Sequence, residues 1–188
     1  MSLRNALKEI TSELYECIKP QKVDFNELKG VQNLFVIQSA SLELFREFYS
    51  KLVKENDTIK LYVLTHSQNK DMIIQLCGED CKVICYNGSG NYNIENCEED
   101  IQSLLKSTKI EKCLIFYNNR YGYSYENVEE IALLVSSKEV LVYNTFSELM
   151  KIDNLSLRME SSKALYSLSC WFWEYCLTLN QINEVERC

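Results

Sequence analysis

Residues 112–143, KCLIFYNNRYGYSYENVEEIALLVSSKEVLVY, decide the fold class of this chain. The stretch begins with an apolar run at 113–116 and ends with a second apolar run at 140–143. Between them, a polar loop leads into a segment with helical spacing of apolar residues, and we expect that helix to begin near Ser124. A short buried strand, a helix and a second buried strand form a βαβ unit with parallel strands.

The same alternation extends outward from this unit. Further apolar strands are predicted at about 34–38, 59–65 and 82–86, and helices are predicted after Ser41, over 70–76 and over 98–107. Short apolar strands that alternate with helices favour a parallel sheet covered on both faces. The sequence therefore predicts an α/β fold, a three-layer Rossmann-like domain with a mainly parallel five-stranded sheet. Residues 21–30 are interpreted as a connection and 145–151 as a short helical turn.

Helical patterns also lie at both ends of the chain. Residues 3–19 have apolar residues three and four apart, and Pro20 ends that helix. A long helix is predicted over 155–179. We expect a single domain over 1–188, made of an N-terminal helix and connection (1–30), a sheet core (33–151), and a C-terminal helix and tail (155–188).

Composition excludes several classes of protein. The 188 residues are 46% hydrophobic and 25% charged, with a net charge of −7, which argues against a nucleic-acid-binding face. No stretch reaches the about 18 uncharged apolar residues of a membrane span, since 164–179 is short and contains Glu174. Nine cysteines without an apolar N-terminal signal favour reduced thiols and a cytoplasmic location.

Neither a metal nor a cofactor is expected. Cys77, Cys81 and Cys85 are each separated by three residues, a spacing that does not match zinc or iron–sulfur motifs. The Gly88-Ser89-Gly90 run lacks the third glycine and the following helix start of a dinucleotide-binding loop.

Candidate ligand-binding residues follow the predicted strands, because ligands of open parallel sheets bind at the carboxyl ends of the strands. Ser39 and Ser41 offer a helix start to an anion, with simple helix capping as the alternative. His66, the only histidine, is the one weak candidate for catalysis, as a general base or a phosphate ligand; an ordinary exposed loop residue is the alternative.

The loop after the fourth strand is the most distinctive local feature. Asn118, Asn119 and Arg120 precede a run in which Tyr121, Tyr123 and Tyr125 alternate with small residues. Arginine recognises phosphate and carboxylate groups, and aromatic rings stack on bases or sugars. Structural packing of the loop is the alternative interpretation.

A wide apolar stripe on the C-terminal helix predicts a homodimer surface, with burial against the same chain as the alternative. The stripe is centred on Trp171 and comprises Leu165, Leu168, Trp171, Phe172, Tyr175 and Leu179.

Residues 117–128 (YNNRYGYSYENV), followed by Ile131-Ala132 and by 138–143 (KEVLVY), resemble the Rossmann-like half domains of bacterial glycosyltransferases of the GT-B class. Those half domains have a strand, a Gly-Tyr-x-Asn-Val…Ala segment, and a strand that ends near a short Leu-x-x-Leu helix. In this chain Tyr125-x-Asn127-Val128 and residues 146–150 stand at those places. The resemblance covers 33–151.

The resemblance implies a function but no catalytic residue. A GT-B enzyme has two such halves, and the second holds most of the donor nucleotide, whereas this chain has room for one. It would therefore be an acceptor-side half with a partner subunit or a non-catalytic role. Asn127 would either contact a ligand or pack against the first turn of its own helix.

We accordingly predict a glycosyltransferase-like domain, related to surface polysaccharide synthesis, that binds a sugar or nucleotide through His66, Asn118, Asn119 and Arg120. One alternative is a non-enzymatic interaction module that assembles through the Trp171 helix. Another is a flavodoxin-like cofactor binder, although the flavin phosphate loop is missing.

Overall fold

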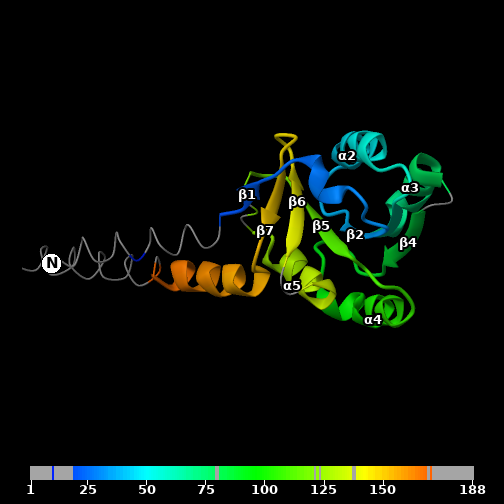
Figure 1. The fold of residues 1–188 in the computed structure, drawn as a ribbon. Helices are drawn as coiled ribbons and strands as arrows, with labels where there is room; N and C mark the ends of the chain where they lie inside the picture. The colour runs from blue at the N-terminus through cyan, green and yellow to red at the C-terminus, as the bar shows by residue number, and fades with distance from the viewer. Residues whose placement is uncertain are drawn as a thin grey trace, which may run out of the picture. The chain divides into compact units, whose positions relative to one another are not determined.

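Figure 1 shows the computed structural model, which describes residues 10, 19–78, 81–120, 122, 124–136, 139–168 and 170. The chain divides into two compact units, residues 20–156 and residues 1–19 with 157–188. The first unit holds the complete sheet and every predicted site residue. The predicted C-terminal helix is present over 155–168, whereas Trp171 and the centre of the predicted dimer surface lie outside the described residues.

The sheet has the strand order of a Rossmann fold. Reading from one edge to the other, the order is β1-β7-β6-β5-β2-β3-β4, and β2 to β6 are parallel. The parallel part corresponds to the order 3-2-1-4-5, which differs from the 2-1-3-4-5 order of flavodoxin. The strands are β1 (Gln21–Lys22), β2 (Asn33–Ile37), β3 (Lys60–His66), β4 (Cys81–Tyr86), β5 (Lys112–Tyr117), β6 (Val140–Asn144) and β7 (Leu149–Ile152).

Helices cover both faces of the sheet (Figure 1). On one face, α2 (Leu42–Glu55) and α3 (Lys70–Cys77) bury residues such as Phe45, Phe48 and Ile73. On the other face, α4 (Glu98–Ser107) and α5 (Glu126–Val135) bury Ile101 and Ile131. Short 3-10 turns lie at η1 (Phe25–Leu28), η2 (Ser67–Asn69) and η4 (Ile94–Asn96). The predicted α/β class is confirmed, and the five predicted strands form the parallel part of the sheet.

The prediction of five strands is wrong, because two antiparallel strands complete a seven-stranded mixed sheet. Residues 145–151, interpreted from the sequence as a helical turn, contain a hairpin turn and most of β7. The side-chain oxygen of Asn144 accepts hydrogen bonds from the backbone N–H groups of Phe146 (3.0 Å) and Glu148 (3.1 Å). Ser147 adopts a left-handed conformation with φ 59°. These contacts reverse the chain, so β7 pairs with β6.

The same hairpin replaces a helix that the glycosyltransferase resemblance required near residues 146–150. In its place, Leu149, Met150 and Ile152 are buried in the sheet. The two-residue strand β1 pairs with β7 and lies in the segment predicted as a connection. A strand of two residues is too short for any hydrophobic pattern to reveal.

Candidate functional site

The point where the strand order reverses lies between β2 and β5, and it is where Rossmann-like sheets usually bind ligands. Two tyrosine side chains lie there. The Tyr92 hydroxyl donates a hydrogen bond to the Gln38 carbonyl (2.9 Å), directly after β2. The Tyr125 hydroxyl accepts one from the backbone N–H of Asn118 (2.8 Å) and lies 3.5 Å from the Ser39 carbonyl. The chain's own side chains therefore satisfy backbone groups that a ligand would otherwise contact.

Both serines after β2 have structural hydrogen bonds. The Ser39 hydroxyl donates to the Phe116 carbonyl (2.7 Å) and so ties β2 to β5. The Ser41 hydroxyl accepts from the backbone N–H of Leu44 (3.3 Å), which makes it the N-cap of α2. The capping alternative holds for Ser41, and the predicted role of either serine in anion binding stays a prediction.

Arg120 is held by the hairpin on the neighbouring strands. Its guanidinium donates two hydrogen bonds to the Glu148 carboxylate, at 3.0 and 2.7 Å, and lies 5.6 Å from the centre of the Phe146 ring. Hydrogen bonds from Arg120, then from Asn144, lower the pKa of Glu148 to about 2. This bidentate ion pair gives the Arg120 guanidinium a structural role in holding the loop against the hairpin.

The three predicted asparagines also support the local structure. The Asn119 side chain accepts from the Gly122 backbone N–H (2.6 Å), and the Asn118 carbonyl accepts from the Thr145 hydroxyl (3.2 Å). The Asn127 amide donates to the Tyr92 carbonyl (2.7 Å), which links α5 to the loop after β4. The structure does not bring these residues together with His66 in one described pocket, and their ligand contacts stay predictions.

An open pocket of about 600 Å³ lies between the loops that follow β3 and β4. His66 ends β3 and lies at this pocket, as its position after a strand predicted. Its ring packs edge-on against Tyr86, with centres 5.1 Å apart, and obliquely against Tyr92 at 4.8 Å. The lining residues are His66, Ser67, Gln68, Tyr86, Asn87, Gly88, Ser89 and Gly90.

The pocket is lined by neutral polar and aromatic side chains together with His66. Among the described residues that line it there is no Lys, Arg, Asp or Glu. Hydroxyl groups, side-chain amides and backbone groups surround an aromatic wall. Such a set of donors and acceptors fits a ligand with many hydroxyl groups better than one with a net charge.

Tyr86 shapes the wall of the pocket. Its hydroxyl donates to the Asn91 carbonyl (3.0 Å) and accepts from the Asn96 amide (3.2 Å). Gly88 lies so close to the ring that an added Cβ would be 2.5 Å from the hydroxyl oxygen. Only glycine allows this loop to lie against the ring.

Sequence reasoning placed Ser67, Gln68 and Asn87 at strand ends where ligands bind, without choosing them as individual ligand contacts, and it did not name Tyr86 as a site residue. The available signal was their position at the ends of two predicted strands, β3 and β4. Neighbouring parallel strands bring their carboxyl ends to one place, but their adjacency was not predicted from the sequence. The register now pairs His66 with Tyr86.

The three cysteines of this motif lie at the end of α3 and along β4. Burial is high for Cys77 and partial for Cys81 and Cys85. The Cys77 thiol donates a hydrogen bond to Cys81, and this bond together with burial raises the pKa of Cys77 far above its usual range. Within the described ranges, no three His, Cys, Asp or Glu side chains are grouped to hold a metal ion. Over the same ranges, no helix has the length and hydropathy that a bilayer span requires.

Comparisons of the chain with models of protein families, with curated proteins and with solved structures found no match.

Proposed function

We propose that this chain is a sugar-binding domain of glycosyltransferase-like character, with its ligand in the pocket between the loops after β3 and β4. The observation that supports the proposal is the uncharged, hydroxyl-rich and amide-rich lining around the His66 and Tyr86 rings. It keeps the predicted function and moves the ligand from the loop after β5 to the loops after β3 and β4.

The pocket suits a saccharide in size and chemistry. Its volume of about 600 Å³ is within the range of small-molecule sites. Ser67, Gln68 and Asn87 offer both donors and acceptors to sugar hydroxyls. Tyr86 is only 2% exposed, so the half-buried His66 ring is the aromatic group of the lining that a sugar ring could pack against.

A nucleotide ligand has less support from side chains. Phosphate groups are usually bound by Arg, Lys or a helix N-terminus, and the described lining has none of these side chains. Backbone N–H groups of the loop over 88–90 would be the remaining donors. We therefore propose a neutral saccharide, such as part of a polysaccharide acceptor, as the ligand.

His66 is the proposed functional group within this pocket. Tyr86 and Tyr92 pack against the imidazole and restrict its rotation. An imidazole so placed hydrogen-bonds a sugar hydroxyl, and in a transferase it would accept the proton of an attacking hydroxyl as a general base. Catalysis would additionally need a donor site, which a second subunit would supply.

Isothermal titration with a panel of monosaccharides, disaccharides, nucleotide sugars and FMN tests the proposal. We expect a neutral saccharide to bind the wild-type protein and His66→Ala to weaken its affinity at least tenfold, or about 1.4 kcal/mol. Arg120→Ala is the matched control, since its side chain is held by Glu148 outside the pocket lining.

Each other outcome has a definite meaning. A saccharide that loses affinity in Arg120→Ala, but not in His66→Ala, would place the site after β5 and overturn the proposed location. Binding of FMN alone would favour a cofactor-binding function, and the absence of binding by any saccharide would refute the proposal.

A further inference from the structure

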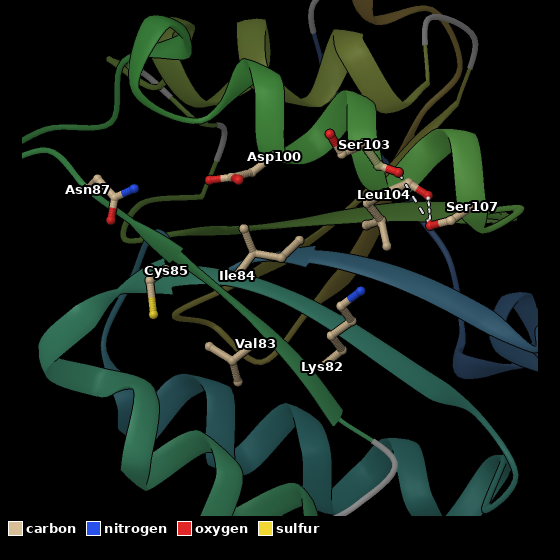
Figure 2. A pocket seen from close by; sticks show the side chains of 9 residues that line it. All are labelled: Lys82, Val83, Ile84, Cys85, Asn87, Asp100, Ser103, Leu104 and Ser107. Carbon is tan, nitrogen blue, oxygen red and sulfur yellow. Dashed lines mark hydrogen bonds between the residues drawn. The ribbon is translucent and has the colours of Figure 1, made fainter.

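A groove runs along the open edge of the sheet, between β4 and α4 (Figure 2). It has a volume of about 400 Å³. The strand contributes residues 82–85 and the following Asn87, and the helix contributes Asp100, Ser103, Leu104 and Ser107. This surface is separate from the proposed sugar pocket, although Asn87 contributes to both.

The two edges of the sheet differ in how they are protected. At one edge, β1 has only two residues. At the other, β4 has six residues, Cys81–Tyr86, with neither proline nor glycine among them. In the part of the chain that the structure describes, no strand pairs with the outer side of β4. A long, regular edge strand exposes backbone donors and acceptors that favour pairing with another strand.

Charges of opposite sign lie at the two ends of the groove. Figure 2 shows Asp100 with Asn87 at the carboxyl end of β4, and Lys82 towards Ser107 at the amino end. Among the ion pairs of the described residues, none includes Lys82 or Asp100. A strand that binds here is therefore favoured if it brings a cation to the Asp100 end.

We propose that the groove binds β4 of a second copy of this chain, in antiparallel pairing, to form a symmetric dimer with one continuous sheet. Antiparallel pairing sets the amino end of one β4 against the carboxyl end of the other. Lys82 of each copy then lies at the Asp100 end of its partner, so the strand carries the charge that the groove requires. Parallel pairing would instead set Lys82 beside Lys82, with like charges opposed.

The residues of α4 that line the groove are compatible with this arrangement. A two-fold axis perpendicular to the sheet keeps the faces of the two copies aligned, so the two α4 helices meet on the same side. Ser103 and Ser107 have small side chains, and the Ser107 hydroxyl bonds its own helix at the Leu104 carbonyl (3.0 Å). These small side chains permit two helices to approach closely.

Sedimentation equilibrium of the full chain, between micromolar and hundred-micromolar concentrations, tests the dimer. We expect a wild-type dimer, and at least tenfold weaker association for Lys82→Glu and for Asp100→Lys. Each variant alone would oppose like charges at both ends of the interface. An equimolar mixture of the two variants should dimerise again, because every cross-pair in the mixed dimer is attractive.

Lys60→Glu and Glu99→Lys are matched controls, because these exposed residues lie on β3 and α4 but not in the groove. They should leave association unchanged. Recovery in the mixture also shows that both variants are folded. A monomeric wild type, a dimer that tolerates both groove variants, or a mixture that stays monomeric would each overturn the proposal. Saccharide binding by a monomeric wild type would separate this failure from failure of the proposed function.

Discussion

The loops after β4 and β5 begin in the same way and end differently. Each strand ends in a buried tyrosine, Tyr86 or Tyr117. In each loop a glycine then lies against that ring, where a Cβ would be 2.5 Å from Tyr86 at Gly88 and 2.3 Å from Tyr117 at Gly122. The two loops thus share one packing arrangement at two places on the carboxyl edge, with β2 and β3 between them.

The other residues of the two loops differ. After β5, the Tyr125 hydroxyl, the Asn119 side chain and the Arg120 guanidinium all bond groups of the protein. After β4, residues 88–90 line an open pocket together with His66 at the end of β3. Large polar side chains, which are conspicuous in a sequence, serve here to close a loop. The open pocket is lined by small and amide side chains beside the His66 ring.

The largest effect is expected from Gly122→Ala. Gly122 has φ +76°, and its added Cβ would be 2.3 Å from a Tyr117 ring carbon. Backbone strain and overpacking together should lower the free energy of unfolding by about 3 kcal/mol in a urea titration. Gly30→Ala is the control, since φ is +73° but nothing lies within 4 Å. It should cost about 1 kcal/mol. Equal losses would show that the Tyr117 contact is unimportant.

The matching change after β4, Gly88→Ala, should be milder for stability but harmful to binding. Overpacking against Tyr86 should cost about 2 kcal/mol and weaken saccharide affinity in the titration described above. Gly90→Ala, with φ +80° and nothing within 4 Å, tests the effect of backbone conformation alone. If Gly90→Ala weakened binding equally, the ring contact would not define the pocket.

Tyr125→Phe tests whether the loop after β5 is closed without a ligand. The change removes the hydroxyl that accepts from Asn118 and should cost about 1 kcal/mol of unfolding free energy. Saccharide affinity should stay constant. Tyr62→Phe, on the half-buried β3 side chain, is the control and should be close to neutral. A large loss of affinity in Tyr125→Phe would return the site to the β2–β5 junction.

The smallest effect concerns acid stability. The folded protein lowers the pKa of Glu148 to about 2 from its ordinary value of 4.5, mainly through Arg120. The stabilisation is therefore complete above about pH 4.5 and is lost as pH falls towards 2. Because Arg120 is half-exposed, we expect less than about 1 kcal/mol.

Thermal unfolding of Glu148→Gln between pH 2 and 7 checks this expectation. The variant should differ from wild type near neutral pH, and the difference should shrink as the pH falls below 4.5. Glu55→Gln, at an exposed position that ends α2, is the control. A difference that stays constant with pH would rule out the ion pair as its source.

The sequence predicted the parallel half of the fold well, because hydrophobic runs of five to seven residues mark buried strands. The predicted strand 59–65 differs from β3 by one residue, and Ser41 caps the helix that it was expected to begin. The hairpin between β6 and β7 was missed because its turn contains neither glycine nor proline. Asn144 and Ser147 make the turn instead.

The missed hairpin also explains why Arg120 was predicted to contact a ligand. Without the hairpin, nothing in the sequence places Glu148 beside residue 120, so the arginine seemed available to a ligand. His66 was easier to place, because it directly follows a strand whatever its neighbours are. The pocket itself could not be predicted, because it forms only where β4 lies beside β3. Strand order does not follow from the hydrophobic pattern of a single strand.

The pairing of β1 with β7 imposes an order on folding. Gln21, near the start of the sheet unit, pairs with Lys151, near its end. The strands β2, β3 and β4 are consecutive in the chain and adjacent in the sheet, so they can assemble while synthesis continues. The β1 edge cannot form until β7 has left the ribosome. Until then β1 has no strand partner, and a chain shortened before residue 149 would never complete that side of the sheet.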